Sequence, residues 1–303
     1  MSTSLLDLSA VTLLCVETRD PALAHFAMQK CTQQARFGKM VLITDLAKLS
    51  NRLDDQAINQ AEEQAEDQEK KLQVDQRVNQ QANQKVARLQ GVEYIQAPPI
   101  KTTKDYSDLL LTGLRQYVAG THVLIIQWDS FILHPLLWTN DFLQYDYIGA
   151  VWPHHPETPV GNGGFSLRSV KLLEALESPA ITKRHPEDFC ICDDNKAILE
   201  NQFGIQFAST QVAEQFAVER TEWHPAFGFH GFFNFGKVLN PHELTEFLQL
   251  LPDAYLGGVD TYDLMQYLIE HQNKALVESI WRRVKFRWKM RKNYLRTQFK
   301  LMN

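Results

Sequence analysis

The chain has 303 residues, of which 44% are hydrophobic, and it carries a net charge of −5. This length and composition suit one large domain or two small ones with a sizeable core. No segment approaches the roughly 18 consecutive apolar residues of a transmembrane helix, and residues 1–10 lack the basic and apolar regions of a secretory signal peptide. The four cysteines form no CxxC pair, which argues against a structural zinc site. We therefore expect a cytoplasmic protein with reduced thiols.

The first 44 residues predict a strand, a helix and a second strand. Residues 11–16 (VTLLCV) and 40–44 (MVLIT) are short apolar runs rich in β-formers. Pro21 suits a first helical turn, so a helix is expected over residues 22–36, before a break at Gly38. A strand, a helix and a strand in this order form a βαβ unit, which implies a parallel sheet.

Residues 51–90 differ in composition from the rest of the chain. Ten of these forty residues are Gln, and the segment contains no Gly, Pro or aromatic residue. This composition predicts a polar, solvent-exposed helix or helical hairpin, with partial disorder as the alternative. Strand signals resume at residues 92–95, so we interpret the segment as an insertion within one domain.

The remaining elements continue the alternation of strands and helices. The strongest strand signal is residues 121–127 (THVLIIQ). Another strand is expected at residues 147–151, and helices are expected at residues 106–119, 170–176, 188–200 and from 241 onward. These segments predict an α/β fold with a central, mainly parallel sheet and helices on both faces. We expect one domain over residues 1–278.

Residues 279–303 form a basic C-terminal tail, for which we expect a helix. The tail contains nine Lys or Arg, no acid and several aromatic residues, whereas the rest of the chain is strongly acidic. Each cation near an anionic leaflet contributes about 1 kcal/mol, and Trp and Phe favour the membrane interface. We therefore expect the tail to bind an anionic membrane surface, with docking onto the acidic body of the same chain as the alternative. Nucleic acid is not expected as a partner, because the acidic body would be repelled.

Asp129 lies two residues after the end of the apolar run of residues 121–127. In open α/β sheets, ligands bind beyond the carboxyl ends of the strands. A carboxylate at that place can hold a divalent cation, which would neutralise a nucleotide diphosphate. The alternative is that Asp129 only caps a turn together with Ser130.

Three further groups of residues have both a functional and a structural interpretation. Gly161–Gly164 contains three glycines, which would permit close approach to a ligand or form only a hairpin turn. Glu187 and Asp188 would supply a general base or would cap the start of a helix. His230 would bind a metal, line an acceptor site, or serve only the structure.

Six segments, in this order, resemble those of the GT-A-fold glycosyltransferases: VTLLCVETRDP, LIIQWDS, YDYIGAVW, GNGGFSLRS, PEDFCICDD and GFHGFF. The sequence is most similar to an uncharacterised glycosyltransferase-like family of bacteria and eukaryotes, which is distantly similar to inverting galactosyltransferases. The segments span nearly the whole chain except the Gln-rich insertion and the tail. The resemblance implies a GT-A-like, Rossmann-related fold.

The resemblance also implies roles for particular positions. Asp129 and His230 would bind a divalent cation, Mn²⁺ or Mg²⁺. Gln127 replaces the first acid of the Asp-x-Asp motif and brings no charge, so metal-free transfer is the alternative. Asp188 would be the catalytic base, and Glu187 would bind sugar hydroxyls. The donor nucleotide would contact Glu17, Thr18, Arg19, Gln127, Trp128 and, at a phosphate, Arg168. The sugar and acceptor pocket would contain Trp152, Asn162, Gly163 and Gly164.

The activity that the resemblance implies is transfer of a sugar from a nucleotide-sugar donor, with a UDP-sugar favoured. The acceptor would be a hydroxyl of a saccharide or a lipid-linked saccharide in polysaccharide biosynthesis, and the transfer would invert the anomeric configuration. One alternative is a nucleotidyltransferase that makes the nucleotide sugar, although residues 17–21 lack the glycine of its usual phosphate loop. The other is a non-catalytic assembly protein that uses the Gln-rich insertion to pair with another chain.

Overall fold

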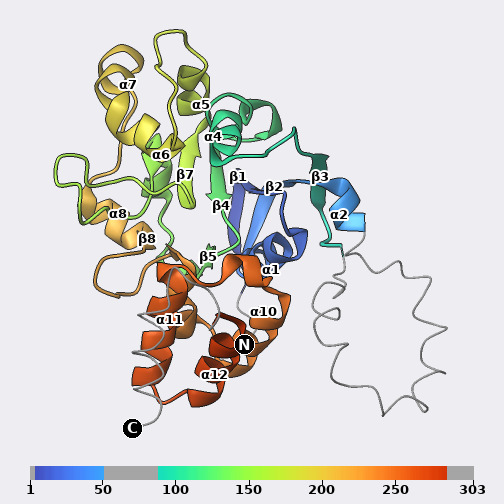
Figure 1. Cartoon of the computed structure of the whole chain (residues 1–303). Coiled ribbons are helices and arrows are strands. Elements are labelled where there is room, and N and C mark those ends of the chain that lie inside the picture. Colours follow the sequence, from blue (N-terminus) through green and yellow to red (C-terminus); the bar gives the residue numbers. More distant parts are fainter. Residues whose placement is uncertain (1–3, 51–87, 285–303) are drawn as a thin grey trace. The chain divides into compact units, whose positions relative to one another are not determined.

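The computed structural model describes residues 4–50 and 88–284. The described residues fall into two compact units, which comprise residues 4–46 with 89–230, and residues 47–50 and 88 with 231–284 (Figure 1). Nearly all of the Gln-rich insertion, and the tail after residue 284, lie outside the described residues. The predictions made for them, and the prediction of one domain over residues 1–278, stay predictions. In the described part of the chain, no helix is both long and apolar enough to cross a bilayer.

A six-stranded sheet with the order β3-β2-β1-β4-β7-β6 forms the framework of the first unit. β3, β2, β1 and β4 pair in parallel, and β7 pairs antiparallel with both of its neighbours. The strands are β1 (Leu6–Glu17), β2 (Ala35–Thr44), β3 (Val92–Gln96), β4 (His122–Ile126), β6 (Tyr147–Ile148) and β7 (Phe165–Ser169). Helices flank this sheet (Figure 1), so the predicted α/β fold with a mainly parallel sheet is confirmed.

Helix α1 (Pro21–Thr32) begins as the sequence predicts. Asp20 accepts a hydrogen bond from the backbone N–H of Ala22 at 3.2 Å, and Pro21 occupies the first turn. The seven residues of β1 before this helix, 11–17, are all buried, as is usual for a parallel strand covered on both faces.

The end of α1 differs from the prediction, because β2 begins at Ala35 rather than at residue 40. β1 also begins early, and its first residues pair with Ala35 to Phe37. Gly38, which we expected to break a helix, lies inside β2. A β-carbon on Gly38 would come within 2.1 Å of the carbonyl oxygen of Ser9, where the register of β1 shifts. The glycine therefore permits close strand pairing instead of ending a helix.

The other α-helices described before residue 230 are α2 (Leu46–Ser50), α4 (Thr103–Thr112), α5 (Val170–Leu176), α6 (Glu187–Phe189), α7 (Lys196–Phe203) and α8 (Thr210–Phe216). The helix predicted for residues 106–119 ends early, because Gly113 follows its last turn as the C-cap. The helix predicted for residues 188–200 is divided, since a π-helical turn at Cys190–Asp194 separates α6 from α7. The strand predicted for residues 147–151 contains only the two residues of β6.

One hydrophobic cluster of the first unit lies between the parallel strands and the helices α4 and α5. Its buried side chains are Leu14, Val16, Val41, Ile43, Ala97, Leu110, Leu114, Val118, Val123, Ile125 and Leu173. Because the strand residues come from β1, β2 and β4, burial of this cluster stabilises the parallel pairing.

The topology brings three loops to one edge of the sheet. β1 and β4 are parallel, and Cys15 pairs with Ile126, so both strands end at this edge. β7 runs antiparallel to β4 and pairs Phe165 with Ile126, so the loop before β7 reaches the same edge. The turn after β4 leads into a second sheet, which has three strands in the order β5-β9-β8. Its strands are β5 (Ser130–Ile132), β8 (Ala217–Val218) and β9 (Gly228–His230). Residues far apart in the sequence can therefore meet at this edge.

The second unit is helical in its described part. Its helices are α9 (Phe235–Val238), α10 (Pro241–Leu250), α11 (Val259–Glu270) and α12 (Lys274–Val284). Phe232, Phe235 and Phe247 pack together, with ring centroids 4.7 to 6.1 Å apart. Asn240 and Glu243 form a capping box at the start of α10. The helices predicted from residue 241 onward are thus confirmed up to residue 284.

Candidate functional site

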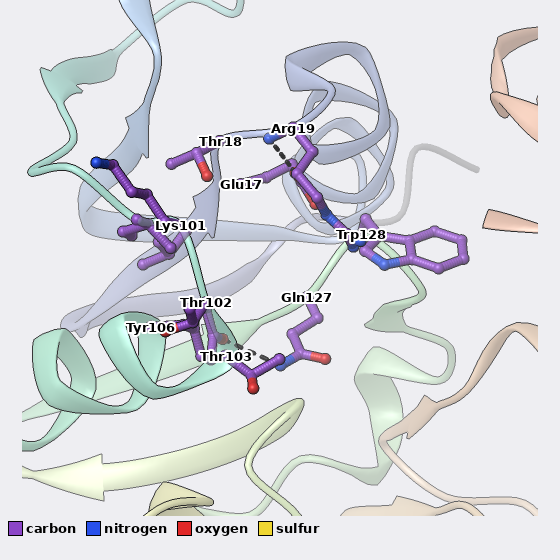
Figure 2. Close-up of a pocket in the computed structure, with 11 residues that line it drawn as sticks. Glu17, Thr18, Arg19, Lys101, Thr102, Thr103, Tyr106, Gln127 and Trp128 are labelled. Atoms are coloured by element: carbon purple, nitrogen blue, oxygen red, sulfur yellow. Dashed lines mark hydrogen bonds and ion pairs between the residues drawn. The ribbon is translucent and has the colours of Figure 1, made fainter. Parts of the chain in front are cut away.

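A cavity of about 390 Å³ lies at the carboxyl ends of β1 and β4 (Figure 2). It brings together five of the predicted donor-binding residues, namely Glu17, Thr18, Arg19, Gln127 and Trp128. The opposite wall comes from the loop before α4 and from the first turns of that helix, which contribute Ile100, Lys101, Thr102, Thr103 and Tyr106. These five lining residues did not emerge from the sequence, since no local motif marks the loop.

The carboxylate of Glu17 stabilises the turn that follows it in the chain. It is 6% exposed, and Oε1 accepts hydrogen bonds from the backbone N–H groups of Arg19 at 2.6 Å and Asp20 at 3.1 Å. Glu17 therefore fixes the turn between β1 and α1, which in turn places Thr18 and Arg19 on the cavity wall (Figure 2).

The side-chain amide of Gln127 has a defined orientation. Its Nε2 donates to the hydroxyl oxygen of Tyr106 at 3.0 Å (Figure 2). Burial raises the pKa of Tyr106 well above its usual value, so this phenol stays neutral. The amide oxygen Oε1 consequently points the other way and lies 3.2 Å from Nε2 of His230.

The hydroxyl of Ser130 closes the turn after β4. The Ser130 hydroxyl accepts from the backbone N–H of Gln127 at 2.9 Å and donates to the carbonyl oxygen of Gly164 at 2.7 Å. The backbone N–H of Gln127 also donates to the Gly164 carbonyl at 2.9 Å. This pairing ties the turn after β4 to the glycine loop. It leaves the buried Asp129 carboxylate directed at His230, whose Nε2 lies 3.5 Å from Oδ1.

His230 lies between two carboxylates. Its Nδ1 is 2.9 Å from Oε1 of Glu219, and its Nε2 faces Asp129. Burial alone would lower the pKa of His230, but Asp129 and Glu219 outweigh this effect and raise the pKa well above its usual value. Glu219 was not among the predicted site residues. It follows the two-residue strand β8, which is too short to give a periodic signal in the sequence.

The donor atoms around Nε2 of His230 suit a hard divalent cation. Nε2 lies 3.2 Å from Oε1 of Gln127 and 3.5 Å from Oδ1 of Asp129. Adjacent ligands of an octahedral cation held at roughly 2.1 Å lie about 3 Å apart, so these separations fit ligands of one ion. No group of three His, Cys, Asp or Glu side chains with metal-binding geometry occurs among the described residues. A cation here would therefore take its remaining ligands from a bound substrate or water.

The backbone of Gly163 and Gly164 passes closely between site residues. A β-carbon on Gly163 would lie 2.3 Å from Oε1 of Glu187, and one on Gly164 would lie 2.2 Å from Nε2 of His230. The alternative of a hairpin turn at these glycines is wrong, because the antiparallel bridge joins Val151 to Val160, before the glycine loop. Glycine is required here for close approach to side chains on both sides of the loop.

Asn162 adopts a left-handed conformation, with φ of 59°. Its Oδ1 accepts from the backbone N–H of Phe165 at 3.3 Å, and its Nδ2 lies 3.0 Å from Nδ1 of His230. Asparagine tolerates this conformation better than most residues. The side chain thus connects the glycine loop to the imidazole.

Arg168 and Glu187 form a buried ion pair beneath the glycine loop. Arg168 is 0% exposed, and its Nη2 lies 3.5 Å from Oε1 of Glu187. Its Nε donates to Ser166 at 3.1 Å, while Nη1 has no hydrogen-bond partner among the described residues. Burial raises the pKa of Glu187 against the opposing effect of Arg168. Neither side chain lines the cavity at the ends of β1 and β4. The expected contacts of Arg168 with a phosphate and of Glu187 with a sugar stay predictions.

Asp188 follows Glu187 in the chain and is half-buried. Its Oδ2 accepts from the backbone N–H of Gly163 at 3.4 Å, and its Oδ1 accepts from that of Phe189 at 2.9 Å. Trp152 stacks on Phe189, with ring centroids 4.6 Å apart, and also covers Gly161. Asp188 thus lies beside Gly163, and Trp152 covers the first residue of the same loop. The acceptor pocket expected at these residues stays a prediction.

Comparison with known proteins leaves the activity open. A model of a family described as "Protein of unknown function (DUF5672)" matches residues 89–230, which is less than half of the chain. No curated protein matches the sequence.

Among solved structures, the chain is similar to the mannosyltransferase PcManGT of Pyrobaculum calidifontis, solved in complex with GDP-Man and Mn²⁺. The identity is 11% and the TM-score 0.38, with 97% of this chain and 85% of that chain covered. It is also similar to residues 1–349 of TarS from S. aureus, with 11% identity, a TM-score of 0.33, and 96% and 80% of the two chains covered. Both similarities are remote, so the activity has to be inferred from the site itself.

Proposed function

We propose that this protein is a glycosyltransferase that binds a nucleotide-sugar donor at the carboxyl edge of the six-stranded sheet. The observation that carries the proposal is the position of the glycine loop, residues 161–164. Gly164 lies against His230, beside the cavity residue Gln127, while Gly163 lies against Glu187 and Asp188. A cavity for a nucleotide and a candidate base therefore adjoin one loop, at the edge where α/β sheets bind ligands.

The cavity offers suitable partners for a nucleoside diphosphate. Its volume of about 390 Å³ falls within the range of roughly 300–1,000 Å³ that is usual for small-molecule pockets. Arg19 and Lys101 supply positive charge for the phosphates, and Tyr106 and Trp128 supply aromatic surface for a base. We take a UDP-sugar as the favoured donor and a saccharide hydroxyl as the acceptor.

Asp129 and His230, with the amide oxygen of Gln127, would hold a divalent cation, Mn²⁺ or Mg²⁺. When bound, such an ion stabilises the negative charge that develops on a leaving diphosphate. Asp129 supplies the charge that Gln127 lacks. Because Tyr106 orients the amide of Gln127, its oxygen rather than its nitrogen faces this place.

In the proposed reaction, an acceptor hydroxyl attacks the anomeric carbon of the donor sugar. The new C–O bond forms as the bond to the diphosphate breaks, and the nucleoside diphosphate leaves. Asp188 acts as the general base and takes the proton of the acceptor hydroxyl. A single displacement of this kind inverts the anomeric configuration.

Arg168 and Glu187 act in this proposal as positioning residues. Glu187 begins the short helix α6, and the carboxylate of Asp188 follows it directly. The buried ion pair holds this helix start against the glycine loop.

We also propose that the enzyme works in the cytoplasm and that its basic tail contacts the inner face of the membrane. Co-sedimentation with anionic liposomes, compared between the full chain and a variant with Gln at the tail cations, tests the tail.

The donor site is tested by thermal shift and calorimetry with UDP and GDP, each with and without Mn²⁺, followed by transfer assays with a panel of nucleotide sugars. We expect one nucleoside diphosphate to stabilise the protein in a Mn²⁺-dependent manner, and Asp129→Ala to abolish that dependence. Asp141→Ala removes a carboxylate from an exposed residue outside the site and is the matched control. Failure of every nucleotide to bind would refute the proposed function. Unchanged Mn²⁺ dependence in Asp129→Ala would refute only the role of Asp129.

A further inference from the structure

Glu219 and His230 are held side by side by the small sheet. β8 and β9 pair in parallel, with Val218 opposite Phe229. The residues that follow these two positions, Glu219 and His230, are therefore neighbours across the strands, and their carboxylate and imidazole approach to 2.9 Å. Both side chains are only 15% exposed. This burial limits competition from water for their hydrogen bond.

The contact between Glu219 and His230 determines which ring nitrogen of His230 carries hydrogen. An ionised carboxylate can only accept hydrogen bonds, so a contact of 2.9 Å with Nδ1 requires the hydrogen to be on that nitrogen. The amide nitrogen of Asn162 lies 3.0 Å from the same Nδ1 and could donate only to a bare nitrogen. Glu219 therefore requires a hydrogen on Nδ1, whereas Asn162 requires that Nδ1 carry none. We expect the hydrogen to be on Nδ1, because a bare nitrogen facing the buried carboxylate of Glu219 would be repelled. The amide of Asn162 then gives up only one neutral hydrogen bond.

We propose that Glu219 is a positioning residue that fixes the orientation of His230 and presents Nε2 to the cation place beside Asp129. The inference rests on the proposed function, since it takes Asp129 and His230 as the pair that would hold the donor's cation. Nε2 is the ring nitrogen that faces Asp129 and Gln127, at 3.5 and 3.2 Å. A carboxylate that accepts from the far nitrogen of a metal-binding histidine fixes the ring and makes the near nitrogen a stronger ligand.

The neighbours of His230 leave the ring little room, so removal of Glu219 would act on which ring nitrogen carries the hydrogen. On the side of Nε2, the backbone of Gly164 is so close that a β-carbon there would lie 2.2 Å from Nε2 and 2.4 Å from Cδ2. On the other side, Asn162 is itself held by the backbone N–H of Phe165. A cation can bind Nε2 only when this nitrogen gives up the hydrogen that faces Asp129 and Gln127, so the ring must keep its one remaining hydrogen on Nδ1, where Glu219 accepts it. Without the charge of Glu219, Asn162 would donate to Nδ1, and the remaining hydrogen would stay on Nε2 at the position of the cation.

The test uses the full-length protein and three variants. Glu219→Gln keeps the size of the side chain and removes its charge, and Glu219→Asp keeps the charge. Glu222→Gln removes the same charge from an exposed residue three positions later in the chain and is the matched control. The probe is Mn²⁺, with free ion measured by electron paramagnetic resonance, without and with saturating UDP or GDP. Thermal unfolding of each variant checks that it is folded.

We expect Glu219→Gln to weaken Mn²⁺ binding about 10- to 100-fold, as removal of such a second carboxylate does in other histidine sites. Glu219→Asp should recover part of this loss, and Glu222→Gln should bind as the wild type does. A folded Glu219→Gln protein with wild-type Mn²⁺ affinity would overturn the inference. Equal losses in Glu219→Gln and Glu222→Gln would also overturn it, since the effect would then be one of general charge.

A second measurement separates this inference from the proposed function. Nitrogen-15 NMR of the metal-free protein, with the His230 signals assigned by comparison with His230→Gln, reports which ring nitrogen carries hydrogen. We expect hydrogen on Nδ1 in the wild type and its loss from Nδ1 in Glu219→Gln. A bare Nδ1 in the wild type would refute the role of Glu219 even if nucleotides bind. Absence of nucleotide binding together with the expected NMR result would refute the donor site and leave the orientation of His230 established.

Discussion

Gly164 and His230 are packed so tightly that a β-carbon added to the glycine would lie 2.2 Å from Nε2 of the imidazole. The ring cannot move aside without losing its contacts with Gln127 at 3.2 Å and Glu219 at 2.9 Å. We therefore expect Gly164→Ala to displace His230 and to abolish Mn²⁺-dependent stabilisation by a nucleoside diphosphate. Overpacking of this kind costs about 1–3 kcal/mol, so the variant should still fold.

The matched control for this variant is Gly258→Ala. A β-carbon at Gly258 meets no atom within 4 Å, so the same chemical change has nothing to displace. Thermal shift with UDP or GDP, with and without Mn²⁺, compares the two proteins. Retention of the Mn²⁺ effect in Gly164→Ala would show that the position of His230 is unimportant for the ion.

Asp188→Asn tests the proposed base. The amide keeps the shape of the side chain but cannot take the proton of the acceptor hydroxyl, so kcat should fall by about 10²–10⁴-fold. Donor affinity should change little, because Asp188 does not line the nucleotide cavity. Asp193→Asn, at an exposed residue of the following helical turn, is the control. An Asp188→Asn enzyme with wild-type kcat would move the role of base to another residue.

Removal of Arg168 should destabilise the protein strongly. Arg168→Met leaves Glu187 buried without its partner, and breaking a buried ion pair on one side costs about 3–5 kcal/mol. The double variant Arg168→Met/Glu187→Met should recover most of that loss, because both charges are then absent. Urea unfolding measures all three free energies of unfolding.

The contrasting pair for this measurement is Arg115 and Glu174, 2.9 Å apart with side chains 41% and 58% exposed. Arg115→Met should lower the free energy of unfolding by less than about 1 kcal/mol, as expected for an exposed ion pair. If the two arginine variants were equally stable, the buried pair would not be what holds the start of α6 against the glycine loop.

His122 should make stability fall at acidic pH. Burial lowers its pKa below the usual value of about 6.5 and outweighs the hydrogen bond to the carbonyl of Tyr145. The unfolded chain therefore takes up a proton at a higher pH than the folded protein. The contribution of neutral His122 is present above pH 6.5 or so and is lost as the pH falls through the lower, folded-state pKa.

Urea unfolding of the wild type and of His122→Gln at pH 7.5 and 5.5 measures this effect. The variant should lose less stability between the two pH values than the wild type does, and His242→Gln, at an exposed histidine, should behave as the wild type. The same pH dependence in His122→Gln and the wild type would exclude His122 as its source.

The sheet could be predicted from the sequence because its central strands are buried on both faces and read as apolar runs. Residues 11–16 and 121–127 are such runs. Asp129 was singled out by its position after the second run, whereas Glu17 and Gln127 were named from the family resemblance. The glycine loop was identified because close backbone approach demands glycine. What its backbone approaches, His230 on one side and Glu187 on the other, depends on packing that spacing does not encode.

The parts that were missed have weak local signals. Glu219 follows a strand of two residues, and its partner His230 ends a strand of three, so neither strand shows a period. The early start of β2 depends on pairing with residues 6–8 of β1, which no local pattern reveals. The burial of Arg168 is likewise a property of the assembled sheet, since a charged residue in a strand is expected to face solvent unless it is paired.

The carbonyl oxygen of Gly164 receives hydrogen bonds from two groups of the turn after β4, the N–H of Gln127 and the hydroxyl of Ser130. The two sides of the site are therefore mechanically coupled. A shift of the glycine loop on binding one substrate must either move this turn with it or break both hydrogen bonds, each of which contributes about 0.5–1.5 kcal/mol. Because thermodynamic coupling is reciprocal, occupation of either side of the proposed site would change the affinity of the other side through this one shared acceptor atom.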